Sequence, residues 1–79
     1  YPNPFNPETT LIFSLPNAGE VSLVVYDALG SEISELASGW YSNGYHNVTF
    51  SADALPSGLY FARLTAGDFQ QTQRLMLTK

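Results

Sequence analysis

The sequence predicts an all-β fold, an antiparallel sandwich of six to seven short strands. Apolar and polar residues alternate in short segments, and turns containing Gly, Pro, Asn or Asp separate these segments at regular spacing. In addition, no stretch of about a dozen residues keeps a helical stripe of apolar residues free of Gly or Pro. With 79 residues and no cysteine, the chain has the length of one small domain held by packing and backbone hydrogen bonds.

A proline-rich lead-in, residues 1–8, holds three of the five prolines. Proline lacks a backbone donor and biases its predecessor away from helix, so this stretch cannot be a central strand. We expect the lead-in to join the sandwich domain, residues 9–79, to a preceding part of a longer protein. The start at Tyr1, without Met or a signal peptide, favours the same interpretation.

Alternating segments follow, each bounded by turn residues. Asn43-Gly44 is a strong reverse-turn signal, because both residues tolerate positive φ. In the fifth segment we take Tyr60, Ala62 and Leu64 as the inward set, since that choice leaves Arg63 in water. The expected strands are 9–15, 21–25, 32–37, 45–50, 59–65 and 69–77, and Trp40-Tyr41 could form a seventh.

The alternation also predicts the core, because every second residue of a strand faces the same side of its sheet. The predicted core residues are Leu11, Phe13, Leu15, Val21, Leu23, Val25, Ile33, Val48, Phe50, Tyr60, Leu64, Leu75 and Leu77. The outward residues Ile12, Val24 and Tyr26 should form an apolar stripe on one sheet if their strands are neighbours, which would make a second candidate contact surface.

The charge balance excludes one class of partner. The net charge is −4, and Arg63, Arg74 and Lys79 are the three cations, so no basic stripe exists to neutralise phosphates. Nucleic acid is therefore not expected as a partner. The longest apolar run, 23–26, is too short for a transmembrane segment.

No group of residues predicts catalysis. His46 lies in a predicted strand among Tyr, Asn, Val and Thr, so we interpret it as a packing or surface histidine. Glu32 and Glu35 are three residues apart, and alternation along a strand should send them to opposite faces rather than pair them. We expect no catalytic residue and no enzyme activity.

Metal and cofactor binding are not expected either. Asp27, Asp53 and Asp68 lie in predicted turns, without the Asp-rich spacing of a calcium-binding loop. Aspartate in turns commonly accepts hydrogen bonds from its own backbone.

The aromatic residues Trp40, Tyr41 and Tyr45 leave one alternative open. Aromatic faces on a sandwich can stack on sugar rings, as in carbohydrate-binding modules, but aromatic side chains also bury area efficiently in a short chain. An ancillary carbohydrate-binding module of a secreted polysaccharide-degrading enzyme, or a structural spacer, therefore remains an alternative function.

Several sequence boxes resemble the type A sorting domains of the type IX secretion system. The first is Asn3-Pro4-Phe5-Asn6-Pro7-Glu8-Thr9-Thr10, and 13–16, 25–30, 44–50 and 55–64 follow in the order of the family. The opening is also similar to that of the immunoglobulin-like domain of flagellar hook-capping proteins. Relatives often carry several lysines in the last strand, whereas this chain has Gln-rich sequence and a lone Arg74.

The resemblance implies an immunoglobulin-like sandwich that sorts and anchors a larger secreted protein. Expected partners are an outer-membrane secretion translocon, a sortase-like protease and the upstream cargo domain of the same chain. The expected location is extracellular, or the outer-membrane surface of a Gram-negative bacterium. The residues expected to carry recognition by similarity are Gly58, Leu59, Tyr60, Arg74, Leu75, Met76, Leu77 and Lys79.

Overall fold

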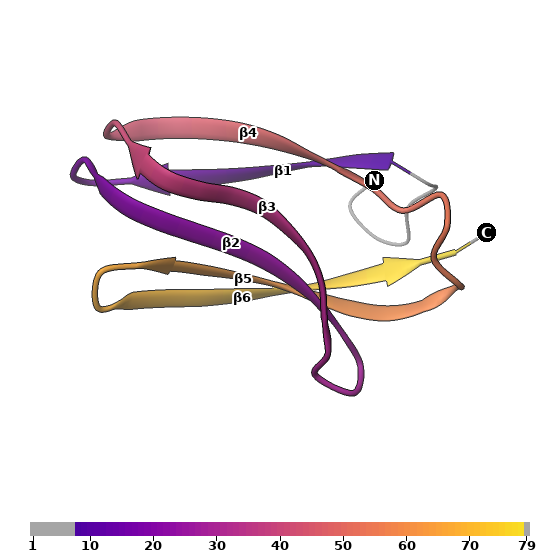
Figure 1. Ribbon diagram of the computed structural model, residues 1–79. Helices are drawn as coiled ribbons and strands as arrows, with labels where there is room; N and C mark the ends of the chain where they lie inside the picture. The colour runs from indigo at the N-terminus through magenta and orange to yellow at the C-terminus, as the bar shows by residue number, and fades with distance from the viewer. Residues whose placement is uncertain (1–7, 79) are drawn as a thin grey trace.

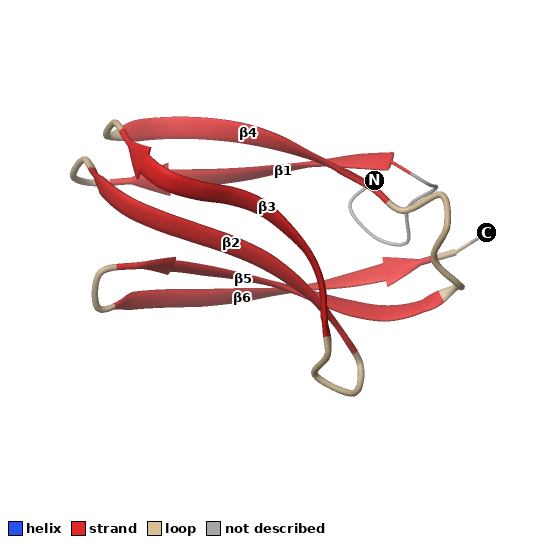
Figure 2. Ribbon diagram, viewed as in Figure 1, coloured by secondary structure: helices blue, strands red, loops and turns tan. Residues whose placement is uncertain are grey.

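The computed structural model describes residues 8–78, which form six β-strands and no helix (Figure 2). The part of the chain that the structure describes therefore holds no helix able to cross a membrane. The strands are β1 (Glu8–Leu15), β2 (Gly19–Asp27), β3 (Glu32–Tyr41), β4 (Gly44–Ser51), β5 (Gly58–Ala66) and β6 (Phe69–Leu77). β1 begins at Glu8, the last residue of the predicted lead-in, and residues 1–7 lie outside the described range.

The strands form two layers of unequal width, as the sequence predicted for a sandwich (Figure 1). β1 and β4 make a two-stranded sheet, and the other sheet has the strand order β3-β2-β5-β6. All pairs are antiparallel. The chain crosses between the layers after β1, after β3 and after β4, while β2–β3 and β5–β6 are hairpins within the larger sheet.

The Asn43-Gly44 dipeptide lies at one of these crossings. It was predicted as a tight reverse turn, and it joins β3 to β4 in the other sheet. Only Gly44 takes a positive φ there, at 110°, since no non-glycine residue described has a positive φ. A β3-to-β4 hairpin would instead have placed both strands in one sheet.

The core lies between the two layers and matches the alternation closely. Ile33 and Val48 are half-buried and pack against it, whereas the other predicted core residues are fully buried. Ala62 is also buried, as expected for the inward set of β5. The buried residues that the sequence prediction did not include are Val24, Ala37 and Ala52.

The predicted stripe of Ile12, Val24 and Tyr26 does not exist. Ile12 belongs to the two-stranded sheet and is 64% exposed, whereas the other two lie on β2 in the larger sheet. Val24 is buried between its cross-strand neighbours Glu35 and Arg63. The prediction failed because β1 and β2, although consecutive, are not neighbours in a sheet.

Two irregularities in β3 change which of its side chains share a face. The register against β2 shifts twice, so that Leu36 and Ile33 are extra residues without a β2 partner. As a result Glu35 pairs with Val24 and Glu32 with Tyr26, and both glutamates lie on the outer face. The expectation that they point to opposite faces was wrong, because the extra residue interrupts the alternation.

β3 also continues further than predicted. Trp40 and Tyr41 are its last two residues and pair with Glu20 and Gly19 of β2, so they do not form a seventh strand.

A tyrosine hydrogen bond fixes the connection into β5. The hydroxyl of Tyr60 donates to the carbonyl oxygen of Pro56 at 2.7 Å, and the ring is buried in the core. A tyrosine that bonds back to the chain just before its own strand is the tyrosine corner of immunoglobulin-like domains. This bond ties the loop between β4 and β5 to the strand that follows it.

Candidate recognition surface

The residues expected to carry recognition are cross-strand neighbours at one end of the β5–β6 hairpin. Gly58 pairs with Leu77, Leu59 with Met76, and Tyr60 with Leu75. The hairpin places them together because its turn, Gly67-Asp68, is two residues long and sets the register of both strands. Two sequence boxes that lie well apart in the chain therefore form one continuous patch.

Only some of these residues are accessible to a partner. Tyr60, Leu75 and Leu77 point inward and are at most 4% exposed. Leu59 is half-buried, while Arg74 is exposed and Met76 is 45% exposed. Lys79 lies outside the described residues.

The accessible residues extend to one that sequence reasoning did not single out. Phe61 pairs with Arg74 and is half-buried on the same outer face. Its outward orientation follows from the inward choice of Tyr60 and Ala62, so the position of Phe61 on the outer face could have been predicted from the alternation along β5. We call the patch formed by Leu59, Phe61, Arg74 and Met76 the hairpin end.

An aromatic and cationic pair continues this outer face toward β2. The guanidinium carbon of Arg63 lies 5.0 Å from the centroid of the Tyr26 ring, in a cation–π arrangement. Tyr26 pairs with Phe61, so its ring borders the hairpin end.

The strand at the end of the sheet adds a second kind of contact surface. β6 pairs only with β5 among the described strands, so one of its edges is not covered by a strand from residues 8–78. Residues 69–74 are all exposed, whereas Leu75 and Leu77 are 1% exposed. β6 therefore divides into a solvated first part, residues 69–74, and an end that Leu75 and Leu77 anchor in the core.

The three aromatic residues considered for sugar stacking do not share one face. Trp40 is 69% exposed on the outer side of β3, and Tyr45 is 82% exposed on the outer side of β4. Tyr41 is half-buried between the layers, with its ring 5.6 Å from the Phe13 ring and 5.1 Å from the His46 ring.

His46 and Asp27 have structural partners. The Nε2–H of His46 donates to the carbonyl oxygen of Ser42 at 2.7 Å, and its ring packs against Phe13. The Oδ1 atom of Asp27 accepts hydrogen bonds from the backbone N–H groups of Leu29 at 3.0 Å and Ser31 at 2.8 Å. Both interpretations made from the sequence, a packing histidine and a turn aspartate, agree with these contacts. Within residues 8–78, no three His, Asp or Glu side chains gather as a metal site would require.

The fold and this surface define a small β-sandwich module whose distinctive accessible features are a hairpin end and a sheet edge. Comparison with known families identifies its role. The model of the secretion system C-terminal sorting domain matches residues 1–78, so the chain belongs to that family. A search of curated proteins and a search of solved structures gave no match.

Membership establishes what the domain does. It is a C-terminal sorting signal for the type IX secretion of a larger cargo protein. The family is not catalytic, and it implies a larger cargo chain together with secretion machinery. Proteins with this signal are secreted to the cell surface or the extracellular space of Bacteroidetes.

Proposed function

We propose that the outer-membrane translocon recognises this domain through the hairpin end and the adjacent edge of β6. The observation that carries the proposal is the cross-strand pairing of Gly58 to Tyr60 with Leu75 to Leu77, which joins both expected recognition boxes in one patch. The inward members hold the patch in shape, and the outward members contact the partner. The domain itself has no enzyme activity in this proposal.

The chemistry of the patch suggests how a partner binds. The outward side chains are apolar at Leu59 and Met76 and cationic at Arg74. A partner strand can add to the backbone groups at the edge of β6, and the Gln-rich sequence there keeps that edge hydrated until it is bound. Arg74 supplies the positive charge that several lysines supply in relatives.

A further part of the proposal concerns the connection to the cargo. Residues 1–8 act as the link between the sorting domain, residues 9–79, and the upstream cargo domain. After export, a sortase-like protease removes the sorting domain at this link and leaves the cargo at the surface. Mass spectrometry of surface-released cargo tests this part, and cargo that retains residues 9–79 after export contradicts it.

A double substitution at the hairpin end tests recognition in a bacterium that carries the type IX system. A reporter protein fused to this chain is expected to lose most of its export when Met76→Glu and Arg74→Glu are introduced, because both side chains are exposed contacts. Leu29→Glu is the matched control, since Leu29 is 92% exposed in the β2–β3 turn. Export is measured as the extracellular fraction of the reporter.

Folding of each variant is checked by urea denaturation of the isolated domain. Normal export of a folded Met76→Glu/Arg74→Glu variant contradicts the proposal, and so does an equal loss of export with Leu29→Glu. Deletion of 75–79 is a poorer experiment, because it removes the fully buried Leu75 and Leu77 and therefore combines recognition with folding.

A further inference from the structure

The outer face of the four-stranded sheet carries its acidic and basic residues on opposite sides. The basic residues are Arg63 of β5 and Arg74 of β6, which are the cations within residues 8–78. The acidic residues of the opposite edge strand, β3, are Glu32 and Glu35. Both glutamates face outward because the two extra residues of β3 interrupt its alternation. The bulges therefore give this face an acidic edge.

The register places these residues in transverse rows of cross-strand neighbours. One row, which we call the aromatic row, has an acid and a base at its ends and consists, from β3 to β6, of Glu32, Tyr26, Phe61 and Arg74. The next row, in the same strand order, is Glu35, Val24, Arg63 and Thr72. A third row is uncharged and consists of Ser38, Ser22, Thr65 and Gln70. Both charged rows therefore run from an acid on β3 to a base on β5 or β6.

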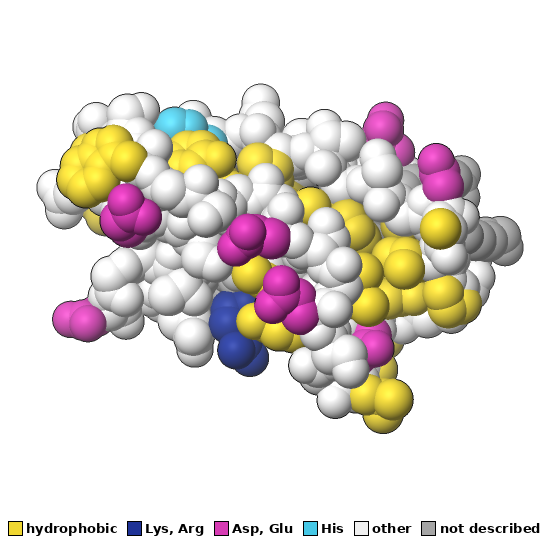
Figure 3. Space-filling view, in the orientation of Figure 1, with side chains coloured by type: hydrophobic (Ala, Val, Ile, Leu, Met, Phe, Trp, Pro, Cys, Tyr) yellow, Lys and Arg dark blue, Asp and Glu magenta, His cyan; other side chains and the backbone are white. Residues whose placement is uncertain are grey.

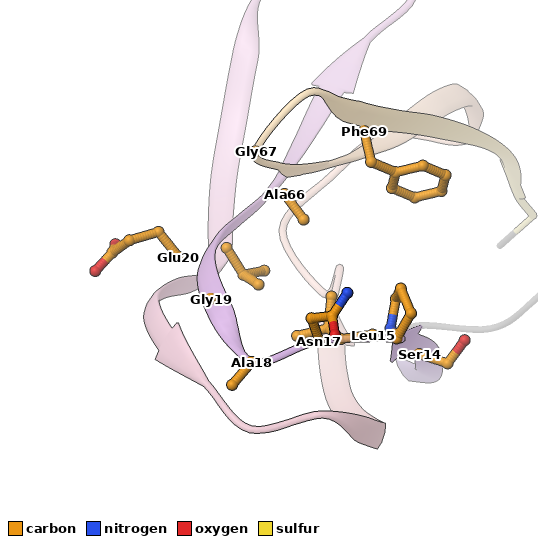
Figure 4. A pocket seen from close by; sticks show the side chains of 11 residues that line it. Ser14, Leu15, Asn17, Ala18, Gly19, Glu20, Ala66, Gly67 and Phe69 are labelled. Carbon is orange, nitrogen blue, oxygen red and sulfur yellow. The ribbon is translucent and has the colours of Figure 1, made fainter.

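The acidic residue of β2 lies toward one end of this face. Glu20 pairs with Trp40, beyond the uncharged row. Figure 4 shows its side chain pointing away from the cavity at the β1–β2 turn. Asp68 lies in the β5–β6 turn, at the same end of the sheet. These two acids are therefore well separated from the aromatic row.

The outer face is accessible to a partner. β1 and β4 form the other layer of the sandwich, so within residues 8–78 no strand covers the outer side of the larger sheet (Figure 1). A hollow of about 290 Å³ adjoins the aromatic row, and its lining includes Tyr26, Phe61 and Arg63. In Figure 3 the basic atoms on the visible surface lie in one area, beside hydrophobic side chains and close to acidic ones. The face thus combines apolar and charged groups at its centre.

A face with this order of residues is complementary to itself. When two copies pack face to face about a two-fold axis parallel to the strands and midway between β2 and β5, each row meets the same row in reverse order. Glu32 then meets Arg74 of the partner subunit, and Tyr26 meets Phe61 of the partner subunit. Symmetry makes each contact twice. An axis across the strands would instead place acids against acids.

The size of the face predicts a weak dimer. Four strands about 4.8 Å apart, crossed by four outward rows about 7 Å apart, make a face of about 20 by 25 Å. Two copies would bury about 1,000 Å² in total, which is at the low end for specific interfaces. The hollow beside Tyr26 leaves room for the ring of the facing Phe61.

We propose that the outer face binds a second copy of this chain in a weak symmetric dimer, with Glu32 of each copy paired to Arg74 of the partner subunit. Phe61 and Arg74 also belong to the hairpin end, so the dimer covers that patch and excludes a second partner from it. The dimer does not depend on recognition by the translocon. It is measured on the purified chain, whereas recognition is measured as export, so either proposal can fail alone.

Dilution of the 79-residue chain tests the dimer directly. Sedimentation is expected to give a dissociation constant between about 10 µM and 1 mM. Amide shifts in nuclear magnetic resonance spectra that change on dilution are expected in β2, β3, β5 and β6. A chain that remains monomeric at about 1 mM overturns the proposal, and so do dilution shifts confined to β1 and β4.

An exchange of charges between two variants tests the arrangement. Glu32→Arg and Arg74→Glu each place like charges face to face, so each variant alone is expected to associate at least about tenfold more weakly than the parent chain. In a mixture, every contact between the two different chains joins an acid to a base again. Mixed dimers are therefore expected to form about as well as the parent dimer. Isotope labelling of one variant detects them, and absence of shifts on adding the other overturns the arrangement.

Glu8→Arg is the matched control for net charge. Glu8 is exposed on β1, in the other sheet, and its substitution changes the charge as Glu32→Arg does. Alone, it is expected to associate as the parent chain. Its mixture with Arg74→Glu is expected to form few mixed dimers, because Glu32 still faces the introduced glutamate. Equal effects of Glu8→Arg and Glu32→Arg, alone or in the mixtures, show that net charge is the cause and overturn the pairing. Amide dispersion confirms that each variant is folded.

Discussion

Three polar side chains of this domain bond to backbone groups within four residues of themselves. Asp27 accepts from the turn that follows it, His46 donates to the carbonyl of Ser42, and Tyr60 donates to the carbonyl of Pro56. A turn or crossing leaves backbone groups without strand partners, and these side chains satisfy some of them. Asp27, His46 and Tyr60 belong to residue types that enzymes use in catalysis, but in this domain they stabilise the connections between strands.

The hydroxyl of Tyr60 gives the clearest test at this scale. Tyr60→Phe keeps the buried ring and removes the 2.7 Å bond to Pro56, so the free energy of unfolding is expected to fall by about 1 kcal/mol. Urea denaturation measures the change. Tyr45→Phe is the control, because Tyr45 is 82% exposed and its hydroxyl can bond to water. An equal loss in both variants would show that the Pro56 bond is not the cause.

At the scale of single strands, the alternation of apolar and polar residues in the sequence predicted most strand positions and most inward-facing side chains. It located all six strands and the inward faces of β1, β2 and β5, because side chains on a regular strand alternate without exception. It did not predict the two extra residues of β3, Ile33 and Leu36, since a bulge depends on how β3 meets β2 rather than on β3 alone.

The same reasoning explains the outcome for the candidate surface. Resemblance supplied the residues of β5 and β6, but only the register of the hairpin shows that they pair. Alternation along each strand then separates inward Leu75 and Leu77 from outward Arg74 and Met76. The unequal widths of the two sheets were not predicted, because strand patterns do not show how many strands each sheet holds.

The turn of the β5–β6 hairpin permits a prediction at the same scale. Gly67 has φ of 61° and no described non-glycine residue has a positive φ, which fits a type II′ turn with glycine at its first central position. Gly67→Ala is therefore expected to cost about 1–2 kcal/mol of unfolding free energy, measured by urea denaturation.

A matched glycine supplies the control for this turn. A Cβ added at Gly67 or at Gly19 meets no atom within 4 Å, so neither substitution causes a clash. Gly19 does not have a positive φ, and Gly19→Ala is expected to be neutral or to stabilise by up to about 1 kcal/mol. If the two substitutions cost the same, backbone conformation at Gly67 is not what the turn requires.

At the scale of the whole molecule, a narrow sheet covers only part of a wide one. The core is therefore concentrated under β1 and β4, and it takes Leu75 and Leu77 from the last strand while Phe69, Gln71 and Gln73 stay exposed. The C-terminal end of the chain is thus both part of the core and part of the candidate recognition surface. On the proposal made above, the hairpin end is therefore presented to a partner only when β6 is folded.

This coupling predicts unequal effects of neighbouring residues. A domain of 79 residues has an expected stability of about 4–12 kcal/mol, from about 0.05–0.15 kcal/mol per residue. Leu77→Ala removes a side chain that is 1% exposed and should cost about 2–5 kcal/mol, whereas Met76→Ala, at 45% exposed, should cost less than about 1 kcal/mol. Urea denaturation of the isolated domain measures both. In the reporter assay, Leu77→Ala should reduce export in proportion to the unfolded fraction, and cooling should restore it. Met76→Ala should reduce export without unfolding, and export that follows stability alone in both variants would show that Met76 is not a contact.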